Sequence, residues 1–371
     1  MKQKFKIQIR IANGLFLFVM AGVILFSNAC TDHSTEPVVN LKPKTPKPEW
    51  APDITDQMWV VIEKLISYQD PPLPTLTPQR ARMNHTVKDA VMDLLAENNI
   101  TPKLPMVDTS GVKIAVYDGV IHARIYKPKT GTGPFPVIVY YHGGGWVIAN
   151  IDVYDASARA LSEKVGAIVV SVGYRKGPEY KFPTAHNDAY QAYGWVVKNI
   201  GGMNGDTSKI GVAGESAGGN LAANVSIMAR DKGERMPKHQ LLVYPVAASD
   251  TNTASYIKYS NAKPLDKPSI KWFLMHYLND VPKESKDTRI SIVDADLKNL
   301  PPTTIISAQI DPLETEGNTL KEKLEAAGVK VTRKLYQGTT HEFFGTDALV
   351  PEAKEAQDYA ASEFRTSFKM K

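Results

Sequence analysis

From about residue 107 onward, short apolar segments alternate with segments that have helical spacing. The apolar segments occupy residues 136–141, 167–172, 210–213, 241–244 and 304–307. Such runs, rich in valine and isoleucine, are typical of parallel strands that are buried on both faces. The intervening segments 156–164, 187–199, 217–230 and 320–327 place apolar residues three or four positions apart. This alternation predicts an α/β fold with a mostly parallel central sheet flanked by helices.

Residues 107–371 are predicted to form this α/β domain, which opens with a hairpin around the turn signal Asp118-Gly119. Residues 53–106 have a different pattern. They contain two stretches of helical spacing, at 59–66 and 87–95, separated by the proline-rich break at 70–74. We expect these helices to form a cap on the α/β domain, to which residues 249–294 add.

The first 29 residues have the layout of a secretory signal. A basic stretch at 1–10 precedes an apolar stretch at 11–26, which is shorter than the ~20 residues that usually span a bilayer. The following Ser27-Asn28-Ala29-Cys30 resembles a bacterial lipoprotein cleavage site, where the cysteine receives lipid and becomes the first mature residue. Simple cleavage after Ala29 and retention as a membrane anchor are the alternatives.

Residues 30–52 contain five prolines among lysines and threonines, which predicts an extended spacer. A lipid on Cys30 and this spacer would hold the domain away from a membrane. The expected location is therefore the bacterial cell envelope, as an outer-membrane lipoprotein, or else the periplasm or the medium.

Charge and cysteine content narrow the classes of function. The net charge is +5, but four basic residues and no acidic ones fall within the first 29 positions. The remaining chain carries only +1, so a nucleic-acid-binding surface is not expected. The single cysteine excludes an intramolecular disulfide and a metal site built from several cysteines.

The motif Gly214-Glu215-Ser216-Ala217-Gly218 follows a predicted strand and opens a predicted helix. This setting is typical of a nucleophile elbow, in which a sharp turn presents the serine hydroxyl above the sheet. Ser216 is therefore the candidate nucleophile, and the N–H of Ala217 can point toward the attacked carbonyl. A glycine-rich corner without chemistry is the alternative reading of this motif alone.

A second glycine-rich loop, His142-Gly143-Gly144-Gly145-Trp146, follows the predicted strand at 136–141. Its backbone N–H groups are uncovered by side chains, so those of Gly143 and Gly144 can bind a developing oxyanion. Loops of this type form the oxyanion hole of lipases and esterases. His142 stands at the start of the loop, and we expect it to be structural.

A serine nucleophile needs a histidine that takes its proton and a carboxylate that orients the histidine. In the chain order expected after an elbow, Asp311 and then His341 stand at the ends of predicted strands. They are the candidate acid and base. Glu314 and Glu316 are alternative acids.

These motifs resemble the hormone-sensitive-lipase-like family of α/β-hydrolase carboxylesterases, from about Leu73 to the C-terminus. Two further segments carry the resemblance, at Tyr174-Arg175-Lys176-Gly177-Pro178-Glu179 and at Leu73-Pro74 with Thr77-Pro78. The resemblance implies an α/β-hydrolase fold with a helical cap and a serine carboxylesterase that forms an acyl-enzyme. It further implies short-chain esters as substrates, with no metal or organic cofactor.

Four positions depart from the family pattern: Lys176-Gly177 stands where Leu-Ala is usual, Thr315 replaces an acidic residue, and Glu342 replaces a frequent glycine. An amidase or another acyl hydrolase with the same triad is the alternative function. A non-catalytic binding protein on the same fold is disfavoured, because His341 is present. The sequence makes no prediction of the oligomeric state.

Overall fold

The computed structural model describes residues 40–370. The predicted signal segment and Cys30 lie outside these residues, so the lipoprotein hypothesis stays a prediction. None of the helices within residues 40–370 combines the length and the hydrophobicity that a membrane-spanning helix needs.

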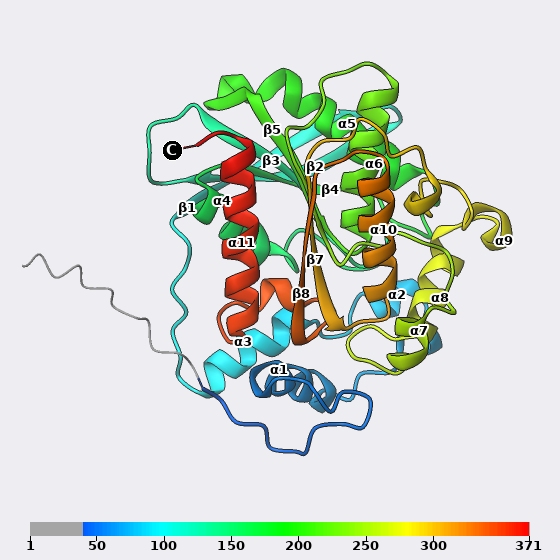
Figure 1. Ribbon diagram of the computed structural model, residues 1–371. Coiled ribbons are helices and arrows are strands. Elements are labelled where there is room, and N and C mark those ends of the chain that lie inside the picture. Colours follow the sequence, from blue (N-terminus) through cyan, green and yellow to red (C-terminus); the bar gives the residue numbers. More distant parts are fainter. Residues whose placement is uncertain (1–39, 371) are drawn as a thin grey trace, which may run out of the picture. The chain divides into compact units, whose positions relative to one another are not determined.

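An eight-stranded sheet forms the centre of the domain, in the order β1-β2-β4-β3-β5-β6-β7-β8 (Figure 1). The first three strands in this order pair antiparallel and the others pair parallel, which confirms the mostly parallel sheet. The strands are β1 (Val107–Val116), β2 (Gly119–Pro128), β3 (Phe135–Tyr141), β4 (Ile168–Gly173), β5 (Gly205–Glu215), β6 (Gln240–Val243), β7 (Thr303–Ile310) and β8 (Val331–Thr340).

Helices cover both faces of the sheet (Figure 1). The α/β domain contains α4 (Asp155–Val165), α5 (Thr184–Asn199), α6 (Ala217–Asp231), α10 (Glu314–Ala326) and α11 (Pro351–Ser367). Strand β3 shows how the two faces divide, because its successive side chains alternate between them. Val137, Val139 and Tyr141 pack in one core with α5, α6 and α10, whereas Ile138 and Tyr140 pack in the other with α4 and α11. Both faces of the strand are buried, which explains its uninterrupted apolar sequence.

Segments from two regions of the chain form the cap. The first contains α1 (Asp56–Ser67), α2 (Pro78–Ala81) and α3 (Val87–Glu97); Thr55, Thr77 and Thr86 cap their N-termini. The second contains α7 (Ala254–Lys258), α8 (Lys267–Tyr277) and α9 (Val281–Glu284). The two regions meet where the Trp272 indole donates a hydrogen bond to the Leu76 carbonyl, 3.0 Å away. Short 3-10 turns lie at Leu73–Thr75, Ile200–Met203, Ile292–Asp294 and Phe343–Gly345.

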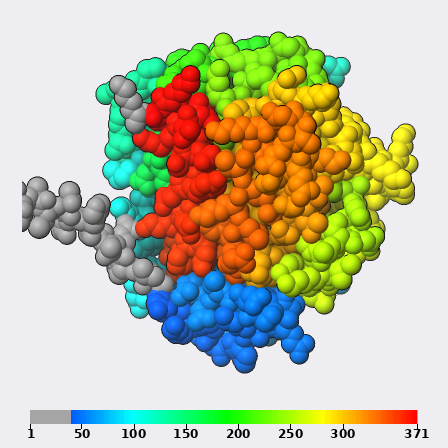
Figure 2. Space-filling model, viewed as in Figure 1, coloured from blue at the N-terminus to red at the C-terminus, as the bar shows by residue number. Residues whose placement is uncertain are grey.

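The N-terminal cap helices lie over one end of the α/β domain, against its C-terminal part (Figure 2). Residues 40–52, which the sequence assigns to the spacer, contact helix α1. The Trp59 indole donates to the Thr45 carbonyl at 3.1 Å, Trp50 packs edge-on against Trp59, and Ala51 is buried. The packed part of the chain therefore begins before residue 53, because Trp50 and Ala51 supply apolar surface within the proline-rich stretch.

Candidate active site

Ser216 lies in the tight turn between β5 and α6, where its backbone has φ 55° and ψ −120°. This conformation is costly for a residue with a side chain and occurs mainly at functional turns. The turn is held by hydrogen bonds from the Ser216 N–H to the Val243 carbonyl, 2.9 Å, and from the Val246 N–H to the Ser216 carbonyl, 3.2 Å. A Cβ at Gly218 would lie 2.0 Å from the Tyr141 carbonyl oxygen, so the close approach of α6 to β3 requires glycine there. The structure thus has the strand–turn–helix geometry that the motif predicts.

Asp311 and His341 lie together at the ends of β7 and β8. The Nδ1 atom of His341 is 2.7 Å from the Oδ2 atom of Asp311, and both side chains are buried. The other oxygen of Asp311 accepts a hydrogen bond from the Leu313 N–H at 2.9 Å, which fixes the carboxylate toward the histidine. This arrangement leaves Nε2 of His341 for proton exchange with a nucleophile.

The two alternative acids have other partners. Glu314 forms an ion pair with Arg333, with 2.5 Å between Oε1 and Nη2. Glu316 is buried and accepts a hydrogen bond from the Ala247 N–H at 2.9 Å. Neither side chain has a recorded contact with His341 in the part of the chain that the structure describes, so the geometry favours Asp311.

The protonation of His341 depends on the carboxylates around it. Burial disfavours the charged imidazole, but the negative charges of Asp311, Glu342 and Glu215 outweigh this effect and raise the pKa of His341. Such a histidine can hold the proton that it takes from a serine.

The loop after β3 contains two backbone donors without a partner within the described residues, and Gly144 lines the same cavity as Ser216 and His341. Among residues 40–370, no acceptor is recorded for the N–H groups of Gly143 and Gly144. The N–H of Ala217 belongs to the first turn of α6, which has no intrahelical acceptor. Gly144 has φ 95°, a conformation that favours glycine. The N–H groups of the three predicted oxyanion-hole residues are therefore available to donate hydrogen bonds to a substrate oxyanion.

His142 is packed beneath this loop. Its ring stacks on Tyr174 with 4.3 Å between centroids, and its Nδ1 lies 2.8 Å from the Gly143 carbonyl. Burial, and to a smaller extent the nearby charge of Lys176, lowers the pKa of His142 to about 3, so the ring is neutral. These contacts are those of a structural histidine.

One group of residues near the serine was not predicted from the sequence. Glu215, the residue before the serine in the elbow motif, is buried and accepts hydrogen bonds from the hydroxyls of Tyr140 and Tyr244. Burial raises the pKa of Glu215 to about 6, and the Tyr244 ring lies 4.5 Å from that of His341. The acidic residue within the motif was the available signal, but its tyrosine partners come from the ends of β3 and β6.

Ser216 lies on the wall of two hollows of very different size. The larger is a cavity of 610 Å³ between the cap and the α/β domain, and it also contains His341 and Gly144 on its wall. The smaller has a volume of 30 Å³ and a mainly apolar lining that includes Val246 and Leu313. Phe273 of α8 lines both, so the second cap region shapes the space on each side of the serine.

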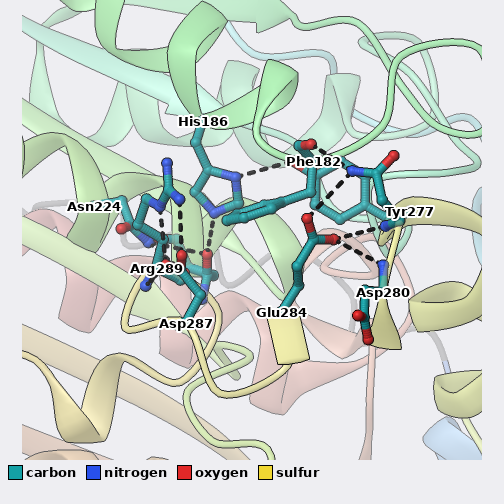
Figure 3. A network of polar contacts seen from close by, with 10 residues as sticks. Phe182, His186, Asn224, Tyr277, Asp280, Glu284, Asp287 and Arg289 are labelled. Atoms are coloured by element: carbon teal, nitrogen blue, oxygen red, sulfur yellow. Dashed lines mark hydrogen bonds and ion pairs between the residues drawn. The ribbon is translucent and has the colours of Figure 1, made fainter. Parts of the chain in front are cut away.

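A polar network holds the second cap region against the nucleophile helix (Figure 3). The imidazole of His186 bridges the Tyr277 hydroxyl, 2.9 Å from Nδ1, and the Asn220 amide oxygen, 3.0 Å from Nε2. Asn220 stands one turn after Ser216 in α6, and its amide also donates to the Ile290 carbonyl at 3.1 Å. The network therefore joins α5, α6, the end of α8 and the segment after α9.

Comparison with known proteins agrees with this geometry. Residues 138–345 match the family described as having the α/β hydrolase fold. The chain belongs to this family. Its curated and solved relatives include carboxylesterases, as the sequence motifs lead one to expect.

Two curated relatives and one solved structure illustrate the similarity. The chain is 39% identical over 245 residues to carboxylesterase NlhH of Mycobacterium tuberculosis, covering 65% of this chain and 77% of NlhH. It is 30% identical over 251 residues to an ethyl acetate hydrolase of Pseudomonas putida, covering 66% of this chain and 79% of that protein. The hyperthermophilic esterase of the archaeon Pyrobaculum calidifontis superposes with a TM-score of 0.78 at 34% identity, covering 85% of this chain and 98% of that one. The protein is a carboxylic ester hydrolase of the hormone-sensitive-lipase-like family.

Proposed function

We propose that this carboxylesterase hydrolyses short-chain esters of small molecules through an acyl-enzyme on Ser216. In this proposal His341 is the general base and acid, Asp311 orients it, and Gly143, Gly144 and Ala217 bind the oxyanion. The observation that supports it best is the 2.7 Å contact between His341 Nδ1 and Asp311 Oδ2, on a histidine that shares a cavity wall with Ser216.

The proposed reaction has two halves. The Ser216 hydroxyl attacks the ester carbonyl while His341 Nε2 takes its proton, and the oxyanion accepts hydrogen bonds from the three backbone N–H groups. The tetrahedral intermediate then breaks its bond to the alcohol, which leaves with the proton from His341. In the second half, water attacks the acyl-enzyme with His341 as base, and the acid and the free serine are released.

The small hollow supports a short acyl chain. A cavity of about 10–15 Å³ holds one water molecule, so the 30 Å³ of the small hollow holds a group the size of an acetyl or propionyl tail. The similarity to an ethyl acetate hydrolase also supports a short acyl chain. The larger cavity would then hold the alcohol part of the ester.

A series of p-nitrophenyl esters from acetate to palmitate tests this assignment, with matched p-nitroanilides as the amide comparison. We expect kcat/KM to be highest within the range of about two to six carbons, at its short end, because the small hollow holds an acetyl or propionyl tail and each methylene gains about 0.8 kcal/mol only while apolar space remains. We also expect the anilides to be far poorer substrates than the esters. Phe273→Ala enlarges the small hollow and should move the optimum to longer chains, by about fourfold in rate for each added carbon that finds room. Met275→Ala is the control, because Met275 lies on the exposed face of the same helix. A wild-type optimum at twelve or more carbons, or efficient anilide hydrolysis, would contradict the proposal.

A further inference from the structure

Most charged side chains on the wall of the large cavity have a fixed partner. The Nη2 atom of Arg82 lies 2.7 Å from Oε2 of Glu179, and the Nζ atom of Lys263 lies 2.7 Å from Oδ2 of Asp266. These two cations are therefore neutralised within the protein.

The acidic groups of the wall are likewise engaged. Asp70 Oδ2 accepts from the His85 backbone N–H at 2.6 Å and lies 2.9 Å from its Nδ1. Glu342 accepts a hydrogen bond from the Tyr154 hydroxyl at 2.7 Å.

Lys176 differs from the other cations of the wall. Within residues 40–370 no carboxylate oxygen lies within 4.0 Å of its Nζ, and the acceptor recorded for it is the Ala149 carbonyl. An ammonium group has three donor hydrogens, so this contact leaves two for a molecule in the cavity. Burial and the charge of Arg82 lower the pKa of Lys176 to about 8, so it remains mostly protonated at pH 7.

The contacts of Lys176 connect it to the oxyanion loop. Lys176 lies two residues after Tyr174, whose hydroxyl donates to the His142 carbonyl at 2.8 Å. Ala149, whose carbonyl accepts from Lys176, also lines the cavity. The charge of Lys176 is close enough to His142 to lower the pKa of that ring. Ala149 also lies against the oxyanion loop, since its Cβ is 2.8 Å from the position that a Cβ would have at Gly144. The part of a substrate that extends from Gly144 into the large cavity therefore shares that cavity with Lys176.

We propose that Lys176 binds a carboxylate of the substrate, so that the enzyme prefers esters whose larger part carries a negative charge. A carboxylate would accept the two remaining hydrogens of the ammonium group in a partly desolvated site, where such bonds are strong. The inference rests on the proposed function, since it takes the alcohol part of the ester to lie in the large cavity.

Two acetates that differ in charge but hardly in shape test the proposal: 3-carboxyphenyl acetate and 3-carbamoylphenyl acetate. For the wild type and each variant we measure one ratio, kcat/KM for the charged 3-carboxyphenyl acetate divided by kcat/KM for the neutral 3-carbamoylphenyl acetate. We expect Lys176→Met to lower this ratio about tenfold to a hundredfold, which is the usual range for a lost hydrogen bond to a charged group. Lys176→Arg, which keeps the charge, should retain most of the preference.

Lys181→Met is the matched control. Lys181 also donates to a backbone carbonyl, that of Leu278 at 2.8 Å, but it does not line the cavity. The ratio should stay at its wild-type value in this variant. Inhibition of the unmodified enzyme by benzoate and by benzamide gives a test that needs no variant, and benzoate should bind at least about tenfold more tightly.

Each contrary outcome has a distinct meaning. A ratio that is equal in wild type and Lys176→Met overturns the proposal, as does equal binding of benzoate and benzamide. An equal loss for both esters in Lys176→Met also overturns it, because the lysine would then act through the oxyanion loop and not on substrate charge. If the wild-type enzyme hydrolysed p-nitrophenyl acetate but neither of these two acetates, the charge preference would be overturned; if it hydrolysed none of the three, the proposed function itself would fail.

Discussion

The loops after β3 and β8 each begin with a histidine that is almost fully buried, 1% exposed for His142 and 3% for His341. Their protonation nevertheless differs. His142 stacks on Tyr174 and hydrogen-bonds a backbone carbonyl, and burial lowers its pKa to about 3. His341 has Asp311 at 2.7 Å and further carboxylates nearby, which raise its pKa despite the same burial. Burial alone therefore keeps a histidine neutral and structural, whereas a buried carboxylate partner lets a histidine accept a proton.

The largest expected effect comes from removing the carboxylate that distinguishes the two histidines. Asp311→Asn should lower kcat on p-nitrophenyl acetate by about 10⁴-fold, because an amide neither stabilises the imidazolium nor holds the required tautomer. Thermal unfolding should show that the variant remains folded. Glu316→Gln is the control, since Glu316 is equally buried in the same region but hydrogen-bonds Ala247. A greater loss in Glu316→Gln than in Asp311→Asn would show that Glu316 orients the histidine.

A smaller effect should come from Glu342, one of the carboxylates that raise the pKa of His341. His341 must be neutral to take the serine proton, so kcat/KM falls as the pH drops through the pKa of the histidine. Glu342→Gln removes a negative charge and should shift this acid limb to lower pH, while the rate on the alkaline side changes little. The full pH profile of kcat/KM measures the shift, with Glu314→Gln as control because Arg333 already neutralises Glu314. A profile that stays in place, or moves to higher pH, would contradict the electrostatic explanation of the difference between the two loops.

Much of the fold could be predicted because the period of the apolar residues reports burial directly. Each predicted apolar run from 136 to 307 lies in a strand or overlaps one, and the helical stretches between them form α4, α5, α6 and α10. Strand ends were less predictable. β5 begins at Gly205 instead of Ile210, because Gly205 pairs with Phe135 of β3 although the residues between are polar. Pairing with a neighbour strand extends a strand beyond its apolar run.

The site shows a similar limit. Ser216, Asp311 and His341 were predictable because their motifs stand at strand ends, where the fold brings them together. The contacts of Glu215 with Tyr140 and Tyr244 were not, because they join three separate strand ends. Glu342 departs from the expected glycine but adopts φ 67°, the conformation for which glycine is favoured. The cavity also depends on how the two cap regions meet, as between Trp272 and Leu76, which no local pattern encodes.

The central claim is that Ser216 is the nucleophile activated by His341, and covalent labelling tests it most directly. An organophosphonate ester should place one adduct per chain on Ser216, identified by peptide mass spectrometry. Ser216→Ala should carry no adduct and lose about 10⁴-fold or more of its turnover while remaining folded. Ser226→Ala is the control and should carry the same adduct on Ser216 as the wild type. Ser226 is a buried serine of α6, the helix that follows Ser216, and its hydroxyl donates to the Ala222 carbonyl. An adduct on another serine, or full esterase activity in Ser216→Ala, would contradict the assignment.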